Sequence, residues 1–209
     1  MSQLTPFPDV ALLNCPDFLQ LDYSSEAELL DYLENFCTTS EDYNPSSEGT
    51  ESGGIQDSEI RQCKLKFFDY IHENTEMADV FQNLLDLTSS INDAYFRFDL
   101  TGFKHIQWTE YGDGDGDHYS WHCDKFPEPI YDNVDTFMHR KLSFSLVFSE
   151  PDEYEGGDFE VMNSGVKQRC EQRRGSLLIF PSWTVHRVLP VTSGKRKSLV
   201  WWAVGPRFR

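Results

Sequence analysis

The chain has 209 residues, a mass of 24.3 kDa and a formal net charge of −17 at pH 7, and 39% of its residues are hydrophobic. This length and composition suffice for one domain with a substantial core, so we expect residues 1–209 to form a single unit. Nucleic acids and anionic membranes are unfavourable partners, because the negative mean field repels phosphates.

The cysteines and the amino terminus are those of an intracellular protein. The five cysteines are odd in number and widely spaced, with no C-x-x-C pair, which indicates reduced thiols. The amino-terminal residues lack a basic stretch followed by a long apolar run, and no segment reaches the about 18 apolar residues of a membrane span. We therefore expect a soluble, cytoplasmic protein.

Residues 1–93 are expected to form an amino-terminal strand and helical support. The apolar opening (VALLN, then FLQLDY) would hold the strand. Helical spacing of apolar residues predicts helices at 26–36, at about 59–74 and at about 77–92. Between the first two, residues 38–59 are rich in Ser, Gly and Glu, which predicts a flexible surface loop.

From Ala94 onward, short β-rich runs replace the helical pattern, and Pro and Gly separate them. The runs are YFRFDL, FKHIQWTEY, KLSFSLVF, GGDFEVM, GSLLIFP, TVHRVLPV and KSLVWWAVG. Helices followed by at least seven strands predict an α+β chain. We expect residues 94–209 to form a sandwich or barrel of jelly-roll type, with the helices packed outside its sheet.

The segment YGDGDGDHYSWHCD, from Tyr111 to Asp124, allows two metal sites. The alternating aspartates after Tyr111 resemble the start of a calcium loop, but His118 stands where such a loop needs glycine, and Asp124 where it needs glutamate. The flanking residues are strand-like rather than helical. The GDGDGD stretch is therefore better explained as a turn between strands with solvated aspartates.

His122 and Asp124 suggest a different site. In an extended segment, residues i and i+2 project from one face, so both side chains can reach one ion. A further ligand must come from a distant strand, and His186 is the natural candidate. Two histidines and one carboxylate leave open positions on the ion, as non-haem Fe(II) oxygenases require. The alternative for His122 alone is a packed or surface histidine.

Arg196 opens an apolar strand in which alternation places Arg196, Ser198, Val200 and Trp202 on one face. If this face lines the interior, the arginine needs a buried anion, and a carboxylate matches its geometry best. A dicarboxylic co-substrate would supply it. The alternative is an arginine at a strand end whose head group reaches water.

With these residues in order, the region from about Ala94 to Gly205 resembles the 2-oxoglutarate- and Fe(II)-dependent oxygenases, specifically the prolyl 4-hydroxylase-like set that includes PKHD-type hydroxylases. The motifs that carry the resemblance are HYSWHCD, YEGGDFEV, GSLLIFPSWTVHRVLPVTSG and RKSLVWW. It implies a double-stranded β-helix (jelly-roll) core. It also implies that His122, Asp124 and His186 bind Fe(II), and that Arg196 pairs with the 5-carboxylate of 2-oxoglutarate.

Further residues match the family less directly. The resemblance implies that Ser198 assists Arg196 and that Tyr111 faces the co-substrate. Gln107, four residues earlier on the same strand face, is a further candidate for co-substrate binding. Gly156 and Gly157 are expected to shape the backbone.

The implied chemistry is C–H hydroxylation coupled to oxidative decarboxylation of 2-oxoglutarate to succinate and carbon dioxide, with dioxygen as oxidant and ascorbate as a candidate reductant. The leading hypothesis is hydroxylation of a peptidyl residue, most simply proline, of a partner protein. A free amino acid or other small metabolite is the alternative substrate, and a non-catalytic jelly-roll binding protein is the third hypothesis.

The segments around the H-x-D motif are unlike those of relatives, so they leave the substrate open. They are GDGDGD (112–117) and KFPEPIYDNVDTFMHRK (125–141). Four nearby aromatic residues are candidates either for the rim of a substrate site or for core packing: Trp121, Phe126, Trp183 and Trp202.

Overall fold

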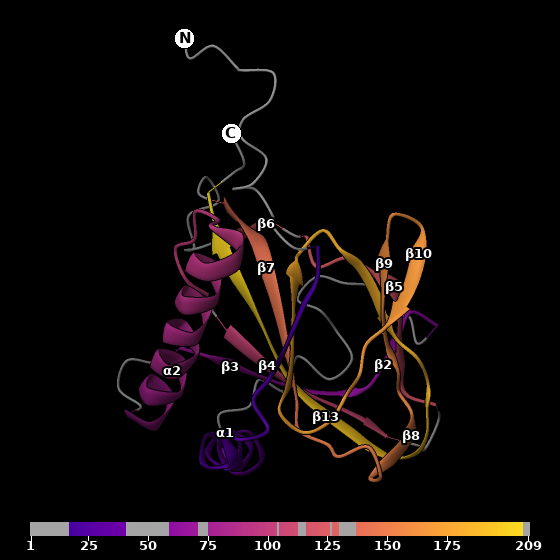
Figure 1. Cartoon of the computed structure of the whole chain (residues 1–209). Helices are drawn as coiled ribbons and strands as arrows, with labels where there is room; N and C mark the ends of the chain where they lie inside the picture. The colour runs from indigo at the N-terminus through magenta and orange to yellow at the C-terminus, as the bar shows by residue number, and fades with distance from the viewer. Residues whose placement is uncertain are drawn as a thin grey trace.

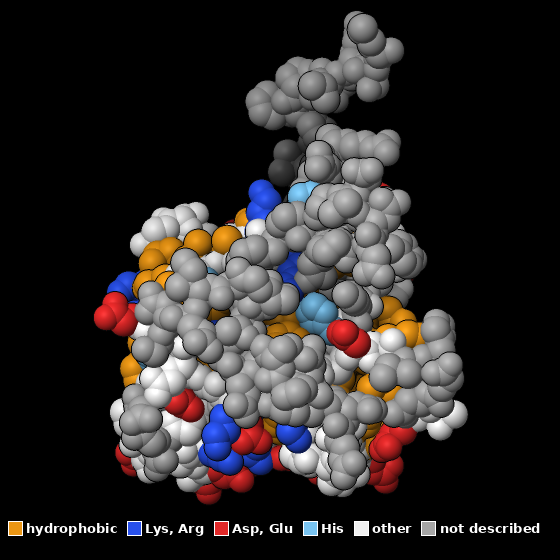
Figure 2. All heavy atoms as spheres, turned by 180° about the vertical axis from the view of Figure 1, so that it is seen from behind, with side chains coloured by type: hydrophobic (Ala, Val, Ile, Leu, Met, Phe, Trp, Pro, Cys, Tyr) orange, Lys and Arg blue, Asp and Glu red, His pale blue; other side chains and the backbone are white. Residues whose placement is uncertain are grey.

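The computed structural model describes residues 17–40, 59–70, 75–103, 105–112, 116–125, 127–129 and 137–206. In these ranges, two antiparallel sheets face each other and two α-helices cover the outer side of the larger sheet (Figure 1). Acidic and basic side chains lie next to one another along the lower edge of the opposite face (Figure 2). No helix in the described part has the length and apolar character needed to span a membrane.

The larger sheet has eight strands and runs in the order β1-β11-β7-β13-β4-β3, with β6 paired to β7 and β8 paired to β13. Its strands are β1 (Leu19–Asp22), β3 (Lys64–Asp69), β4 (His105–Gly112), β6 (Pro127–Pro129), β7 (Phe137–Val147), β8 (Tyr154–Gly156), β11 (Ser176–Pro181) and β13 (Val191–Gly205). The long strand β13 lies between β7 and β4, so both of its neighbours fix the face that each of its side chains occupies.

The smaller sheet has five strands in the order β10-β9-β12-β5-β2. They are β2 (Arg61–Gln62), β5 (His118–His122), β9 (Phe159–Asn163), β10 (Val166–Arg169) and β12 (Val185–Val188). A small apolar cluster closes the space between the two sheets, with members from β4, β9, β11, β12 and β13. The smaller sheet is thus attached to the larger one through side chains rather than through shared strands.

The two helices are α1 (Ala27–Thr39) and α2 (Thr75–Ile91). Their apolar faces and the outer face of the larger sheet form the main core. At its centre, Trp201 stacks on Phe144 at 4.8 Å and its indole N–H donates to Thr88 Oγ1 of α2 at 2.9 Å. The predicted arrangement, a jelly-roll-type core with helices outside the larger sheet, is therefore confirmed.

Most predicted elements are confirmed, including the helices at 26–36 and 77–92 and the strands that contain β4, β7, β9, β11, β12 and β13. The expected loop at 38–59 falls largely outside the described residues, except that Thr38 and Thr39 end α1 and Glu59 precedes β2.

The helix predicted at about 59–74 is wrong, because this segment forms β2 and β3. Leu65 and Phe68 were compatible with a helical face, but β3 pairs with β4 from Lys64 to Asp69 and both of its faces are used. Phe68 enters the main core, whereas Leu65 is buried on the opposite face. Tertiary pairing has overridden the local pattern here.

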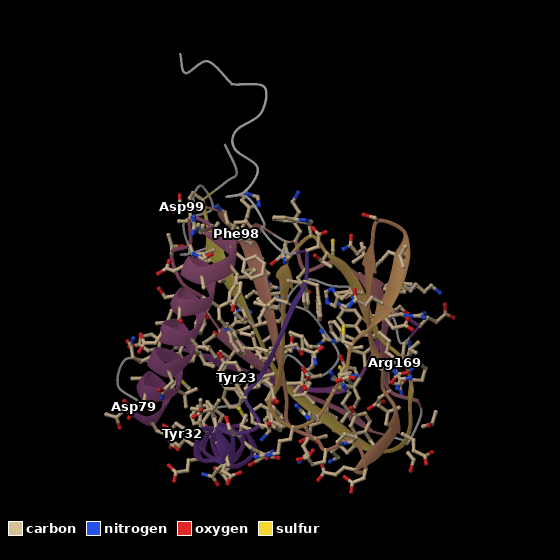
Figure 3. All side chains as sticks on the ribbon, viewed as in Figure 1. Tyr23, Tyr32, Asp79, Phe98, Asp99 and Arg169 are labelled. Carbon is tan, nitrogen blue, oxygen red and sulfur yellow. The ribbon has the colours of Figure 1, made fainter. Side chains whose placement is uncertain are left out.

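The strand predicted at YFRFDL is also wrong. Asn92–Phe96 is a π-helical turn that continues α2, and Arg97 follows in the left-handed region at φ 55°. The Asn92 side chain forms hydrogen bonds with both the N–H and the C=O of Phe98, at 2.9 Å each. These backbone groups are therefore not available to pair with a neighbouring strand. Phe98 and Asp99 lie at the end of α2 opposite Asp79 (Figure 3).

Candidate metal and co-substrate site

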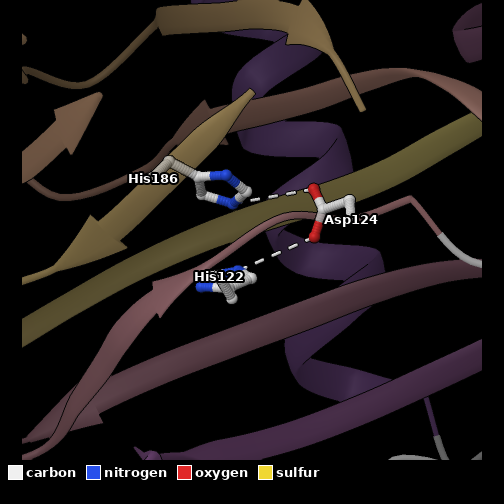
Figure 4. A group of neighbouring side chains, drawn as sticks. All are labelled: His122, Asp124 and His186. Atoms are coloured by element: carbon white, nitrogen blue, oxygen red, sulfur yellow. Dashed lines mark ion pairs between the residues drawn. The ribbon is translucent and has the colours of Figure 1, made fainter. Parts of the chain in front are cut away.

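Three side chains that the sequence singled out come together on the smaller sheet. His186 of β12 lies directly opposite His122 of β5, and Asp124 follows β5 by two residues. Asp124 Oδ1 is 3.6 Å from His122 Nε2, and Asp124 Oδ2 is 3.6 Å from His186 Nε2 (Figure 4). One ligand atom from each residue lies within 4.8 Å of the others. The cluster therefore has the dimensions of a mononuclear metal site.

The second nitrogen of each imidazole is held by the backbone. His122 Nδ1 lies 2.8 Å from the Ser120 carbonyl, and His186 Nδ1 lies 3.0 Å from the Thr184 carbonyl. Because a carbonyl only accepts hydrogen bonds, each Nδ1 carries the proton and each Nε2 presents a lone pair to Asp124. This tautomer is the one in which a neutral histidine binds a metal through Nε2.

The protonation states suit a divalent cation. Burial, and then the neighbouring His186, lower the pKa of His122 to about 3. Burial raises the pKa of Asp124, but His186, His122 and Arg140 outweigh it and the pKa is lowered. At neutral pH the cluster therefore combines an ionised carboxylate with a neutral His122. Two nitrogens and one carboxylate are the donor set of non-haem Fe(II) sites, so the residues fit iron.

The described residues do not support the hypothesis of a calcium-binding loop in this segment. Asp117 Oδ2 accepts a hydrogen bond from the Gly112 backbone N–H at 2.8 Å, and His118 Nδ1 contacts the Gly116 carbonyl at 3.0 Å. These contacts close a turn between β4 and β5. Asp113 and Asp115 lie outside the described residues.

Arg196 is buried on the face of β13 that points away from the helices. Its side chain is 1% exposed, which excludes the alternative of a head group in water. Nε donates to Gln172 Oε1 at 2.8 Å and Nη1 donates to Ser198 Oγ at 3.3 Å, whereas Nη2 is buried without a hydrogen bond. Among the described residues, no carboxylate forms an ion pair with it. A buried guanidinium in this state is costly unless an anion joins it, so the geometry fits a carboxylate ligand.

Tyr111 and Gln107 both lie on β4, the strand that pairs with the strand of Arg196. Tyr111 is the β-ladder partner of Arg196, and the centre of its ring is 5.6 Å from the guanidinium carbon. Burial raises the pKa of Tyr111, so its phenol stays neutral. Gln107 is buried on the same face, but its amide donates to Thr109 Oγ1 at 2.7 Å. Of the two, Tyr111 is the one placed beside Arg196.

One contribution to the site had no signal in the sequence, and another was expected only as a backbone role. Gln172 lies in an irregular segment between β10 and β11 and binds Arg196 only because the chain folds back there. Gly157 has φ +64°, and a Cβ at this position would lie 3.2 Å from Arg196 Cδ and 2.9 Å from Val191 Cγ2. The expected backbone role of the glycine pair thus consists, at Gly157, of leaving room for the arginine.

The four aromatic candidates separate in space. Trp202 is buried near Asp124, where its indole N–H helps to lower the carboxyl pKa although it forms no hydrogen bond of ordinary geometry. The guanidinium of Arg140, which the sequence did not single out, lies 3.9 Å from the Trp202 ring. Trp183 is 42% exposed. The Arg187 guanidinium carbon lies over the Trp121 ring, 4.5 Å from its centre. Phe126 lies outside the described residues.

Part of the chain is similar in sequence to known proteins. Residues 106–204 match the model of the 2OG-Fe(II) oxygenase superfamily. The chain is 38% identical over 89 residues to a PKHD-type hydroxylase of Hyphomonas neptunium, covering 43% of this chain and 38% of that protein. It is 44% identical over 71 residues to a PKHD-type hydroxylase of Parvibaculum lavamentivorans, covering 32% of each. The matched region therefore spans less than half the length of these relatives.

Solved structures share the fold. A prolyl-4-hydroxylase of Pseudomonas putida superposes with a TM-score of 0.65 over 96% of both chains, at 23% identity. A prolyl hydroxylase of Trichoplax adhaerens, in complex with a peptide fragment of hypoxia inducible factor, gives 0.64 at 20% identity over 93% of this chain and 86% of that one. The viral collagen prolyl hydroxylase of Paramecium Bursaria Chlorella virus-1, in a 2OG complex, gives 0.62 at 17% identity over 93% and 99%.

Residues 106–204 thus resemble the 2OG-Fe(II) oxygenase superfamily. Within it, the sequence similarity is to the PKHD-type hydroxylases. The family implies Fe(II), 2-oxoglutarate and dioxygen as cofactors, and the cluster of His122, Asp124 and His186 fits the iron.

Proposed function

We propose that the protein is a hydroxylase that uses Fe(II) and 2-oxoglutarate, with His122, Asp124 and His186 as the iron ligands and Arg196 as the partner of the 5-carboxylate. The observation that carries this proposal is the pairing of two incomplete groups between the same two sheets. One is a cluster of three metal donors, and the other is a buried arginine without a carboxylate. Fe(II) completes the first and a dicarboxylate completes the second.

When bound, Fe(II), 2-oxoglutarate and dioxygen supply an oxidative decarboxylation to succinate and carbon dioxide that is coupled to hydroxylation of a C–H bond. The chain's own part is positioning. His122 and His186 present Nε2, and Asp124 supplies the negative charge. Arg196 orients the co-substrate from the larger sheet, with Ser198 and Gln172 fixing its guanidinium. Tyr111 presents a neutral phenol beside it.

The described side chains around these groups are largely apolar. Phe159 and Phe180 pack against the His186 ring at 5.4 Å and 4.6 Å between ring centres, and both are buried. Val191 of β13 belongs to the same cluster. Apolar walls strengthen the attraction between Arg196 and a carboxylate, and they protect a reactive oxidant from solvent.

For the substrate, we propose a peptidyl residue, most simply proline. The support is the fold that this chain shares with prolyl hydroxylases, one of them solved with a peptide fragment.

The test is to incubate the protein, Fe(II) and 2-oxoglutarate with a proline-rich peptide library and, separately, with a panel of free amino acids. We expect one added oxygen atom on a peptide by mass spectrometry, and succinate formation that Asp124→Ala abolishes. Succinate stimulated only by free amino acids would contradict the peptidyl substrate and support the small-molecule alternative. A wild-type protein that forms no more succinate than Asp124→Ala would favour the non-catalytic binding protein.

A further inference from the structure

The His122 imidazole is the inner layer of a stack of three groups. Its ring lies on the Tyr119 ring with a centre-to-centre distance of 3.4 Å and an angle of 14° between the planes. The Arg61 guanidinium carbon lies 4.6 Å from the centre of the same tyrosine ring. Because His122 covers one face of Tyr119, the guanidinium must occupy the other. Arg61, Tyr119 and His122 therefore follow one another in layers.

An irregularity in β5 makes this stack possible. Residues three apart in a regular strand point to opposite faces, so Tyr119 and His122 should not meet. The pairing with β12 shifts between His122↔His186 and Tyr119↔Val188, so two residues of β5 (Ser120 and Trp121) lie opposite one residue of β12 (Arg187). The extra residue is a β-bulge, which turns Tyr119 to the face of His122. The chain thus departs from regular pairing next to the proposed metal site.

Arg61 comes from β2, the two-residue edge strand of the smaller sheet. It is the ladder partner of Tyr119, and its Nε donates to Cys63 Sγ at 3.3 Å. The planar guanidinium is therefore anchored by its own strand while its flat face covers the tyrosine, an arrangement that lysine cannot reproduce.

The two histidines are held by different means. His186 is 5% exposed and is surrounded by the core rings Phe159 and Phe180. His122 is less buried and sits nearer the sheet edge, where Tyr119 supports one side of its ring and His186 touches it at 4.1 Å with an angle of 56°. Without Tyr119 and Arg61, the contacts that the described residues leave to His122 are the Nδ1 hydrogen bond, the His186 ring and the Asp124 carboxylate at 3.6 Å.

We propose that Arg61 and Tyr119 are positioning residues of the metal centre, which hold the His122 imidazole in the plane where Nε2 faces Asp124. This inference rests on the proposed iron site. Residues behind a metal ligand typically contribute about 10–100-fold to metal affinity. The charge of Arg61 acts in the opposite direction, because a nearby cation repels a bound dication. An effect of the stack is therefore distinguishable from an effect of charge.

The experiment is an anaerobic calorimetric titration of the full chain with Fe(II). We expect Tyr119→Leu to weaken Fe(II) binding by about 10–100-fold, and Tyr119→Phe, which keeps the ring, to bind like the wild type. Arg61→Lys keeps the charge but loses the planar stack, and we expect a loss of about ten-fold. The matched control is Arg187→Lys, which makes the same change on the Trp121 ring at 4.5 Å. It should leave the affinity unchanged.

Thermal unfolding of the metal-free variants accompanies the titration, and Arg61→Lys should melt like the wild type. Unchanged Fe(II) affinity in both Tyr119→Leu and Arg61→Lys would overturn the inference, and so would an equal loss in Arg187→Lys. If Tyr119→Leu does not fold, the difference in Fe(II) affinity between Arg61→Lys and Arg187→Lys is sufficient to test the inference. His122→Ala tests the proposed iron site separately from the stack of Arg61 and Tyr119. If this variant binds Fe(II) like the wild type, the proposed iron site itself is wrong.

Discussion

The two sheets divide the work of the molecule differently. In the larger sheet, stability and chemistry occupy opposite faces of one strand: Leu199 and Trp201 of β13 pack against the helices, while Arg196 and Ser198 point the other way. In the smaller sheet, the two proposed histidine donors lie on strands that no described helix covers, and Asp124 follows one of these strands (Figure 1). We therefore expect that substitutions on the helix-facing side lower stability without weakening ligand binding, and that substitutions at the proposed site do the reverse.

The largest effect is expected from the carboxylate of the metal cluster. Asp124→Ala removes the charged donor and leaves two neutral imidazoles, so Fe(II) affinity should fall by more than the about 10–100-fold typical of residues behind a ligand. Fe(II) titration followed by calorimetry measures this. Asp158→Ala is the matched control, because Asp158 forms only a surface ion pair with Arg169 beside the same sheet. Equal losses in the two variants would contradict the assignment.

The reverse separation is expected on the helix-facing side of the larger sheet. Trp201→Ala should lower the free energy of unfolding by about 3–5 kcal/mol, because a fully buried ring and its hydrogen bond to Thr88 are lost. Urea unfolding measures the change. Trp183→Ala, at an exposed ring that packs on Phe98 at an angle of 50°, should cost only about 1 kcal/mol. If the folded Trp201→Ala protein bound Fe(II) far more weakly, the two faces would not be independent.

Arg196 should affect co-substrate binding without affecting the metal. Arg196→Met removes the guanidinium at similar volume, and losing one partner of a buried charge pair costs about 2–5 kcal/mol, or roughly 30-fold to several thousand-fold in affinity. Equilibrium dialysis of 2-oxoglutarate with Mn(II)-loaded protein measures this. Metal affinity should match the wild type. An unchanged dissociation constant for 2-oxoglutarate would show that the arginine serves another purpose.

The most gradual expected effect is the pH dependence of the metal-free fold. The pKa of His122 is about 3 in the folded chain and 6.5 at its ordinary value. Between these values the unfolded chain binds more protons, so stability falls as the pH drops from about 6.5 towards about 3, by at most about 1.4 kcal/mol per pH unit. His122→Gln should flatten this slope between about pH 6.5 and 4.5 in urea unfolding. An identical slope in the variant would contradict the burial of a neutral His122.

Much of this architecture could be predicted because the motifs are local. His122 and Asp124 are two residues apart, and the alternation around Arg196 identified the face that β13 turns away from the helices. Strands of the carboxy-terminal half were visible as apolar runs between turn residues. These features depend on the strand period, which a sequence displays directly.

The missed features depend on partners distant in the sequence. Residues 59–74 have apolar positions compatible with a helix, and only the pairing of β3 with β4 and of β2 with β5 decides otherwise. Gln172 reaches Arg196 from an irregular segment, and Tyr119 meets His122 through a bulge. None of these contacts has a period or a motif, so the sequence alone could not predict them.

The central claim is that donors on the smaller sheet and the arginine on the larger sheet form one site. The most direct measurement is the visible charge-transfer absorption that develops when 2-oxoglutarate is added to the Fe(II)-loaded protein without oxygen. The account predicts the band in the wild type, no band in Asp124→Ala, and a half-maximal concentration of 2-oxoglutarate raised at least about 30-fold in Arg196→Met. A wild-type band in Asp124→Ala, or an unchanged concentration in Arg196→Met, would contradict it.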